Sequence, residues 1–347
     1  MNVLVTGGAG FIGSAFLRRM LARHPADRFV NLDLLTYAAS REALEGLQGA
    51  SNYRFQKGDI ADRELVFALF AQENFDVVVN FAAESHVDRS IRDPSLFLRT
   101  NLLGTQVLLD AALHFGVSRF HQVSTDEVYG ELPLESTAQF TEDTPLRPSS
   151  PYSASKAGAD LLAFSYHRTY GLPVTVSRCT NNFGPYQHPE KLIPHAIQCA
   201  QNGQPVPVYG TGNHVRDWIF VEDHCSAIEC ILQNGQPGEL YLISAEEPRD
   251  NLSLVREILR LLGKPETQLQ FVADRPGHDR RYALSAEKLR RTLSWRPEHR
   301  FAESLRKTVE WYVENPWALK RPGGVSFTEK EGSGEHVLSD RDSASAL

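Results

Sequence analysis

A glycine-rich segment near the start of the chain restricts the folds open to this sequence. The apolar run at residues 3–5 leads into TGGAGFIG at residues 6–13, and a helical pattern follows. In such a strand–turn–helix unit, Gly7 permits the tight turn, Gly10 lets the backbone approach a pyrophosphate, and Gly13 lets the helix pack closely on the strand. The helix N-terminus also presents amide donors and the positive end of its dipole to phosphate groups. The segment therefore predicts a dinucleotide-binding α/β fold.

The acidic residue Asp33 ends the next strand-like run, residues 29–32. A carboxylate at this place accepts hydrogen bonds from the adenosine ribose hydroxyls, and its charge disfavours a 2′-phosphate. The pattern therefore indicates NAD⁺ rather than NADP⁺ as the cofactor. A plain helix cap is the alternative role for an aspartate at a strand end, but the glycine motif upstream favours the nucleotide.

Further strand-like runs alternate with helical segments through the first half of the chain, and each run ends in a polar or small-residue motif. These motifs are Gly58-Asp59-Ile60, Ala82-Ala83-Glu84-Ser85 and Ser124-Thr125. The carboxylate of Asp59 is placed to meet the adenine amino group, and the small residues at 82–85 let a cofactor lie close to the backbone. This alternation predicts a doubly wound parallel (Rossmann) α/β sheet that binds ligands at the carboxyl ends of its strands.

The composition excludes several classes of protein. The chain has 347 residues and a formal net charge of −7, which argues against a general nucleic-acid binder. Its four cysteines show no CxxC and no His/Cys ligand spacing, which favours free thiols in a reducing compartment over disulfides or a metal site. No apolar stretch reaches membrane-spanning length, and the chain begins directly with a strand-like run. We therefore expect a cytoplasmic protein without a signal peptide, a membrane partner or a metal.

Two segments in the middle of the chain carry candidate catalytic groups. Tyr152 and Lys156 are four residues apart, so on a helix they share one face, and the ammonium of Lys156 can lower the pKa of Tyr152 and contact a nicotinamide ribose. Tyr152 is then a candidate base near neutral pH, and Thr125 would hydrogen-bond the same substrate oxygen. Asp126 and Glu127 directly follow Thr125. A simple dehydrogenase needs no such pair of acids, whereas an enzyme that also removes water from its substrate does.

The complete set of motifs resembles the dTDP-glucose 4,6-dehydratases, a family of extended short-chain dehydrogenases/reductases. The resemblance runs from residue 1 to about residue 315, and it is carried by TGGAGFIGS, NLDLLTYA, GDI, FAAESHVDRSI, the TN of residues 100–101, STDEVYG, SPYSASKAG, NNFGPYQHPEKLIP, YGTG, VRDWIFVEDH and ADRPGHDRRYA. Few families share STDEVYG together with PEKLIP and DRPGHD. The chain departs from the family pattern at residues 38–40 and 243–245, where Ala-Ala-Ser and Ile-Ser-Ala replace Ala-Gly-Asn and Ile-Gly-Gly. Neither departure touches a candidate catalytic residue.

The resemblance implies an internal redox cycle on dTDP-glucose. Tyr152 removes the proton of the glucose 4-hydroxyl while NAD⁺ takes a hydride from C4, and Thr125 steadies that oxygen. Glu127 then abstracts the acidified C5 proton as Asp126 protonates the departing 6-hydroxyl, after which the hydride returns to C6 and a proton returns to C5. The products are dTDP-4-keto-6-deoxyglucose and water, and NAD⁺ is not consumed. A neutral Asp126 beside an ionised Glu127 requires that their pKa values be pushed apart.

The motifs and the resemblance also imply two sets of binding residues. Those expected to line the dinucleotide are Gly7, Gly10, Phe11, Ile12, Gly13, Asp33, Asp59, Ile60, Ala82, Ser85, Thr100, Tyr152, Lys156 and Asn182. Those expected to hold the sugar nucleotide are Ser85, Thr125, Asn181, Lys191, Leu192, Pro207, Tyr209, Arg216, Asn251, Arg275 and His278. Arg216 and Arg275 are the expected partners of the pyrophosphate, because a guanidinium offers bidentate hydrogen bonds.

The sequence divides into two expected domains and a tail. Residues 1–180 are expected to form the NAD-binding domain, joined by a returning segment near 219–232. Residues 181–218 and 245–319 are expected to form a smaller C-terminal substrate-binding lobe. Residues 320–347 are rich in glycine, serine and charged residues, with too little apolar surface to offset the entropy of ordering, so we interpret them as a flexible tail.

Two apolar helix faces bear on the oligomeric state. They lie at residues 102–112 and 161–166. Such stripes are most often part of a protein's own core. The resemblance implies instead that these two helices form a four-helix interface, so we expect a homodimer.

Other readings of the catalytic motifs stay open. Nucleotide-sugar 4-epimerases lack the acidic pair, and UDP-glucuronate decarboxylases typically keep only its glutamate, so Asp126 together with Glu127 counts against both. A 4,6-dehydratase acting on a UDP-sugar is a closer alternative, because the nucleotide base is the feature that the sequence specifies least. A non-catalytic NAD-binding sensor on the same fold would have no reason to keep Tyr152, Lys156 and both acids.

Overall fold

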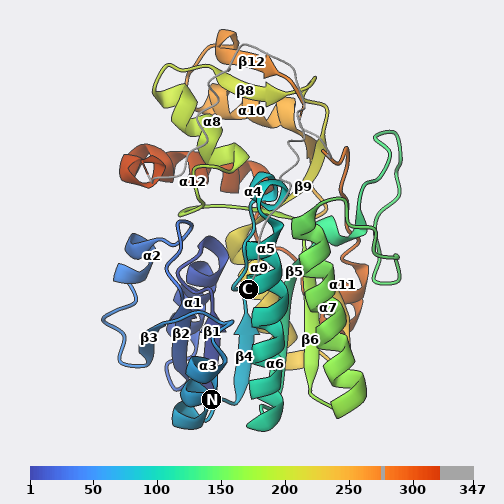
Figure 1. Cartoon of the computed structure of the whole chain (residues 1–347). Coiled ribbons are helices and arrows are strands. Elements are labelled where there is room, and N and C mark those ends of the chain that lie inside the picture. The colour runs from blue at the N-terminus through green and yellow to red at the C-terminus, as the bar shows by residue number, and fades with distance from the viewer. Residues whose placement is uncertain (275–277, 321–347) are drawn as a thin grey trace, which may run out of the picture.

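The computed structural model describes residues 1–274 and 278–320 (Figure 1). The predicted substrate residue Arg275 and nearly all of the predicted tail, 320–347, lie outside the described residues. In Figure 1 a larger part built around a seven-stranded sheet lies below a smaller lobe. No helix of the described residues has both the length and the apolar character needed to cross a membrane.

A parallel sheet forms the centre of the larger part. Its strands are β1 (Asn2–Thr6), β2 (Arg28–Asp33), β3 (Tyr53–Lys57), β4 (Val77–Asn80), β5 (Arg119–Thr125), β6 (Val174–Cys179) and β10 (Leu240–Ile243). They lie in the order β10-β6-β5-β4-β1-β2-β3, and the chain winds outward in both directions from β1. This order confirms the predicted doubly wound fold. It also opens a crevice at the carboxyl ends of β1 and β4, where the winding reverses.

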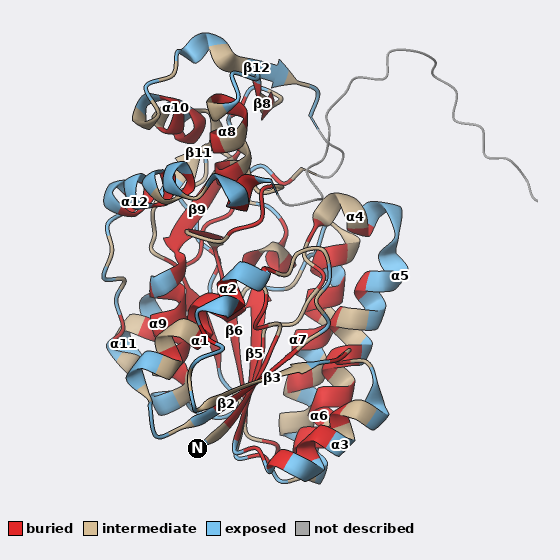
Figure 2. Ribbon diagram, turned by 90° about the vertical axis from the view of Figure 1, so that its left-hand side faces the viewer, coloured by how far each residue is buried: buried red, intermediate tan, exposed pale blue. Residues whose placement is uncertain are grey.

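Helices cover both faces of this sheet. They are α1 (Phe11–Arg23), α2 (Arg41–Glu45), α3 (Arg63–Glu73), α6 (Thr105–His114), α7 (Pro151–Tyr170), α9 (Val221–Asn234) and α11 (Glu287–Leu293). One apolar layer joins the sheet to α3, α6 and α7, and another joins it to α1, α9 and α11. Because strand side chains alternate, Leu4 belongs to the first layer while Val3 and Val5 belong to the second. Figure 2 shows the buried strands between these helices.

A π-helical segment positions the loop that follows β4. The chain passes through α4 (Val87–Arg92), α5 (Pro94–Phe97) and the π-helix η1 (Leu98–Gly104) before α6. The Asn101 side chain accepts from the amide of Glu84 at 2.9 Å and donates to its carbonyl at 3.0 Å. It also donates to the Ser155 hydroxyl at 2.8 Å. Asn101 thus fixes the loop after β4 against α7.

The lobe has its own small sheets and core. Its elements are β7 (Asn181–Phe183), β8 (Val206–Tyr209), β9 (Val215–Phe220), β11 (Pro248–Asp250), β12 (Leu269–Val272), α8 (Leu192–Gln201), α10 (Asn251–Leu261), η3 (Glu266–Gln268), α12 (Phe301–Glu314) and η4 (Pro316–Leu319). Strand β9 pairs with β7 and β11, and β8 pairs with β12. The core contains Phe183, Trp218, Ile258 and Tyr312.

The chain passes between the large part and the lobe more than once, and some of these crossings differ from the predicted boundaries. Residues 221–232 of the predicted returning segment belong to α9, which packs against α1, and β10 continues the large sheet beside β6. Helix α11 falls within the predicted lobe segment 245–319 but packs against β10 and α9. Its Leu289 and the nearby Trp295 complete the apolar layer there. This portion therefore lies on the large sheet rather than in the lobe.

Candidate functional site

A cleft of about 320 Å³ lies at the carboxyl ends of the sheet strands, a volume typical of small-molecule sites. Segments that follow β1, β2, β4 and β5 line it, together with α7 and residues 179–191. Every residue predicted to line a dinucleotide contributes to this lining, as do the five predicted catalytic residues. The predicted substrate residues that line it are Ser85, Thr125, Asn181 and Lys191.

The turn after β1 requires glycine at two positions. Gly7 has a φ of +70°, and a Cβ there would lie 2.6 Å from the amide nitrogen of Ala82. A Cβ on Gly13 would lie 2.3 Å from the carbonyl oxygen of Gly7. Neither position has room for a side chain, so α1 begins directly against the turn. The resulting wall of backbone at a helix N-terminus fits the pyrophosphate of a dinucleotide.

Asp33 lies at the end of β2 and lines the cleft. Its Oδ2 accepts from the amide of Ala9 at 2.9 Å, and its Oδ1 accepts from the amide of Leu35 at 2.7 Å. Burial raises the pKa of Asp33, and these two amide bonds oppose the rise. The carboxylate therefore ties the glycine turn to the strand end. Asp59, also in the lining, forms an ion pair with Arg99 at 2.9 Å.

Replacing Asp33 with alanine is expected to weaken NAD⁺ binding about tenfold or more, because hydrogen bonds to charged groups contribute roughly 1.5–3 kcal/mol. Titration calorimetry on protein freed of nucleotide measures the change. Asp76→Ala is the matched control, since Asp76 accepts from the amide of Asn2 at 2.7 Å, away from the cleft lining. Equal NAD⁺ affinity in Asp33→Ala and the unmodified protein would remove the ribose assignment.

The catalytic candidates converge from β5 and α7. Thr125 ends β5 and caps η2 (Asp126–Tyr129), donating to Asp126 Oδ1 at 3.2 Å and accepting from the Glu127 amide at 3.3 Å. Ser150 caps α7, and Pro151 begins it, which places Tyr152 in its first turn. The Thr125 hydroxyl is also near enough to Tyr152 to lower the pKa of that phenol. The short helix and the long one thus bring four functional groups to one end of the sheet.

Asp126 has the properties of a proton donor. Burial raises its pKa well above the usual value, and the neighbouring Glu127 raises it further, while Arg216 and the Thr125 hydroxyl oppose the rise. Its Oδ2 is buried and has no hydrogen-bond partner among the described residues. A carboxyl group with a raised pKa and an unused oxygen in a cleft is suited to general acid catalysis.

The pKa of Tyr152 is not lowered in this structure, contrary to the expectation that the ammonium of Lys156 lowers it. Burial raises the pKa of Tyr152 well above its usual value, and the charge of Glu127 adds to this, whereas the Thr125 hydroxyl opposes it. Burial also lowers the pKa of Lys156, whose Nζ donates to the carbonyl of Val123 at 2.7 Å. In the protein alone the net direction for Tyr152 is therefore opposite to the predicted one, because burial dominates.

The remaining described substrate candidates lie on the lobe, outside the lining of the cleft. They are Leu192, Pro207, Tyr209, Arg216, Asn251 and His278. Leu192 begins α8 and packs against the lobe core. The guanidinium of Arg216 lies over the ring of Tyr282 at 4.4 Å and donates to the carbonyl of Asp279 at 2.7 Å. Because its charge lowers the pKa of Asp126, Arg216 is near the candidate acid.

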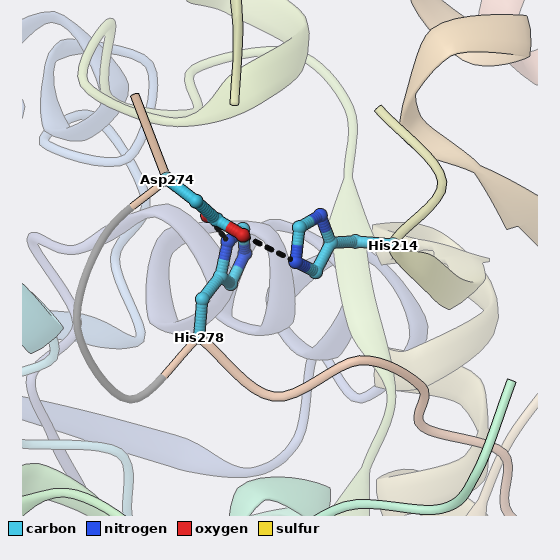
Figure 3. A group of neighbouring side chains, drawn as sticks. All are labelled: His214, Asp274 and His278. Atoms are coloured by element: carbon cyan, nitrogen blue, oxygen red, sulfur yellow. Dashed lines mark hydrogen bonds and ion pairs between the residues drawn. The ribbon is translucent and has the colours of Figure 1, made fainter. Parts of the chain in front are cut away.

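Figure 3 shows a cluster of His214, Asp274 and His278 on the lobe. Asp274 contacts His214 Nε2 at 3.1 Å and His278 Nδ1 at 2.7 Å. The two imidazole rings are stacked, with centroids 3.7 Å apart and planes at 18°. One nitrogen of each ring faces the same carboxylate, and the ligand atoms of the three side chains lie within 4.8 Å of one another, a grouping of possible metal ligands that the sequence did not indicate. Tyr209 lies edge-on to His278, so two substrate candidates are neighbours, and His214 joins them although the motifs did not single it out.

Two buried acids in the cleft were not among the predicted site residues. Burial raises the pKa of both Glu84 and Glu190. Glu190 accepts from the Tyr37 hydroxyl at 3.4 Å and lies 3.4 Å from His86 Nε2, so it links loops of the large sheet to the segment before α8. Both acids occur within motifs already quoted, FAAESHVDRSI and NNFGPYQHPEKLIP. Their place in those motifs is the sequence feature that could have identified them as site residues.

Comparisons with known proteins agree with this geometry. The chain is 55% identical over 301 residues to the low-salt glycan biosynthesis protein Agl12 of Haloferax volcanii, covering 87% of this chain and 95% of that protein. It is 49% identical over 330 residues to a dTDP-glucose 4,6-dehydratase of Xanthomonas campestris pv. campestris, covering 90% and 93%. The crystal structure of DesIV, a dTDP-glucose 4,6-dehydratase from Streptomyces venezuelae with NAD bound, matches with a TM-score of 0.88 and 48% identity, covering 91% of this chain and 98% of that one. The family model for GDP-mannose 4,6 dehydratase matches residues 4–308, and the chain therefore belongs to that family.

Proposed function

We propose that this protein is a dTDP-glucose 4,6-dehydratase, an NAD-dependent hydro-lyase that forms dTDP-4-keto-6-deoxyglucose and water. The observation that carries the proposal is the buried Asp126, which has a raised pKa and an unused oxygen and stands between Thr125 and Glu127 in the cleft. Two relatives that are 49% and 48% identical to this chain over most of its length are named dTDP-glucose 4,6-dehydratases, which supports dTDP-glucose as the substrate. The large sheet would bind NAD⁺, and the lobe would bind the sugar nucleotide.

The cofactor is NAD⁺, which would be held by residues that all line the cleft: the glycine turn, Asp33, Tyr152, Lys156 and Asn182. Bound NAD⁺ supplies reversible hydride storage, so a hydride removed from the substrate can be returned within the same catalytic cycle. The acidic Asp33 disfavours a 2′-phosphate and so favours NAD⁺ over NADP⁺.

The residues of the chain would divide the proton transfers. Tyr152 accepts the proton of the 4-hydroxyl, whose oxygen Thr125 holds by a hydrogen bond. Oxidation at C4 acidifies the proton on C5, and Glu127 accepts it. Asp126, whose pKa is raised by burial and by the neighbouring Glu127, would donate its proton to the departing 6-hydroxyl. The hydride would then return to C6, and a proton would return to C5. Arg216, which the sequence motifs assign to the pyrophosphate, would have to exchange its bond to the Asp279 carbonyl for the substrate.

The test of this function is incubation with dTDP-glucose and, separately, UDP-glucose, followed by mass spectrometry of the products. The proposal predicts loss of one water from dTDP-glucose without net accumulation of NADH. Faster loss of water from UDP-glucose would reassign the base, because the lobe residues that would contact it are the part least specified by the catalytic motifs. An unchanged mass with a new 4-epimer would contradict the dehydratase assignment.

We also propose that the protein is a homodimer and resides in the cytoplasm. Leu103 on η1 is 45% exposed, and Leu161 and Tyr170 on α7 are 60% and 59% exposed, although η1 and α7 pack together. Apolar groups clustered on adjacent helices favour a partner surface, and two such helices from each copy would form a four-helix interface. The four cysteines are free thiols, which supports a reducing compartment.

Introducing glutamate at both Leu103 and Leu161 is expected to convert the dimer to a monomer, because paired interfaces would bring these charges together in an apolar contact. Light scattering coupled to gel filtration measures the mass. Phe271→Glu is the matched control, since Phe271 is 56% exposed on β12 of the lobe. A monomeric unmodified protein, or a double variant that stays dimeric, would contradict the proposed interface.

A further inference from the structure

Helix α7 carries a buried row of functional groups beyond the two predicted from the sequence. Tyr152, Lys156 and Asp160 are spaced four residues apart, so they follow one another along one face of the helix. Asp160 is 0% exposed and Lys156 is 4% exposed. The proposed reaction uses the first two groups and leaves Asp160 without a role.

Asp160 is held by a buried cation from the neighbouring strand. Its Oδ2 accepts from Arg178 Nε at 2.9 Å and from the Ser124 hydroxyl at 2.9 Å. Arg178 lies in β6, and its Nη1 donates to the Tyr129 hydroxyl at 2.8 Å. Because Ser124 directly precedes Thr125, this network is joined to the strand end that carries the catalytic motif.

The arrangement balances two buried cations against one anion. Burial lowers the pKa of Lys156, and the negative charge of Asp160 is the largest effect that opposes this. Burial raises the pKa of Asp160, and the charges of Arg178 and Lys156 oppose that rise. An ion pair with good hydrogen-bond geometry is required for charges to persist in such a place, and removal of one member leaves an uncompensated buried charge.

Other titratable groups around this row come from three elements. They are Cys179 on β6, Asp126, Glu127 and Tyr129 on η2, and Arg216 and Asp217 on β9. Cys179 is buried, and burial raises its pKa, so it remains a neutral thiol near neutral pH. Asp160 and Cys179 both favour the charged form of Lys156, and Asp160, one helical turn away on the same face, has the larger effect.

We propose that Asp160, anchored by Arg178, is a positioning residue that keeps Lys156 protonated during catalysis. The inference rests on the proposed dehydratase function, in which a charged Lys156 stabilises the phenolate that forms on Tyr152. The ammonium lies one helical turn from that phenol, where a positive charge favours the ionised tyrosine. Asp160 touches neither substrate nor cofactor in this account and acts only through Lys156.

The test is the pH profile of C4 oxidation, followed as the absorbance of enzyme-bound NADH in the first turnover with dTDP-glucose. In Asp160→Asn the buried Arg178 and Lys156 lose their shared anion, so Lys156 should lose its proton at a lower pH. The alkaline limb of the profile is expected to move down by about one pH unit or more, the usual effect of a nearby opposite charge. Asp160→Glu keeps the carboxylate and should restore a limb close to that of the unmodified protein.

A matched control separates this effect from general loss of a buried ion pair. Glu229 is 4% exposed and pairs with Arg19 at 2.6 Å between α9 and α1, outside the cleft lining. Glu229→Gln is expected to lower thermal stability without moving the pH profile. A profile of Asp160→Asn that coincides with that of the unmodified protein would overturn the proposal.

Misfolding of Asp160→Asn and failure of the proposed function can each be told apart from failure of the role proposed for Asp160. If Asp160→Asn does not fold, the double variant Asp160→Asn/Arg178→Gln removes both charges and retains an amide pair of similar shape. Its alkaline limb should still move down, by less, and an unshifted limb would overturn the proposal. If the unmodified protein fails to oxidise dTDP-glucose while its NAD⁺ is bound, the proposed function fails, independently of the role of Asp160.

Discussion

Replacement of Asp126 with asparagine is expected to slow the loss of water by about 10²–10⁴-fold, the usual contribution of a positioned general acid. Oxidation at C4 should persist, because Thr125 and Tyr152 are unchanged. NADH should therefore accumulate on the enzyme together with the 4-keto sugar. The reason is that asparagine keeps the shape of Asp126 but has no acidic proton to give to the departing 6-hydroxyl.

Rapid-mixing absorbance of NADH, combined with product analysis, measures both halves of this prediction. Glu127→Gln is the informative comparison, since it should also trap NADH but should abolish exchange of the C5 proton with solvent deuterium, whereas Asp126→Asn should retain that exchange. Normal turnover by Asp126→Asn would show that another group is the acid. For the unmodified protein, the raised pKa of Asp126 also predicts that water loss declines as pH rises through that pKa, because the neutral form is the active one.

Tyr152→Phe is expected to reduce C4 oxidation by about 10²–10⁴-fold, because no other hydroxyl on α7 lies in the lining of the cleft to accept the substrate proton. In contrast to Asp126→Asn, this variant should form almost no NADH on addition of substrate. The first-turnover absorbance assay distinguishes the two directly.

Tyr166→Phe is the matched control for this second prediction. Tyr166 lies farther along the same helix, where its hydroxyl bonds Asp110 away from the cleft. The same loss of one phenolic oxygen should leave NADH formation unchanged there. Oxidation at the normal rate by Tyr152→Phe would remove the tyrosine from the reaction and redirect attention to the acids of η2.

The local sequence was sufficient to predict those features of the fold and the site that depend only on neighbouring residues. The glycine turn was predictable because Gly7 and Gly13 face backbone atoms that exclude any side chain. Asp33 was predictable because a parallel strand ends at the ligand edge of its sheet. The pairing of Tyr152 with Lys156 followed from helical spacing alone.

Properties that depend on tertiary packing were not predictable in the same way. The pKa of Tyr152 is raised because of burial, which its spacing from Lys156 does not reveal. Arg178 and Asp160 are distant from the glycine motif and belong to no ligand pattern, yet they form a buried ion pair one helical turn from Lys156. Helix α11 follows lobe elements in sequence and returns to the large sheet through apolar residues, Leu289, Leu293 and the nearby Trp295, that have no local signature.

The central claim is that one cofactor removes a hydride from C4 and the same hydride returns to C6. The most direct measurement uses dTDP-glucose carrying deuterium at C4, with nuclear magnetic resonance and mass spectrometry of the product. The account predicts deuterium at C6 of the 4-keto-6-deoxy sugar, transferred within one molecule, and a solvent-derived proton at C5. Deuterium that remains at C4 of an epimerised sugar, or that leaves the sugar altogether, would contradict the account.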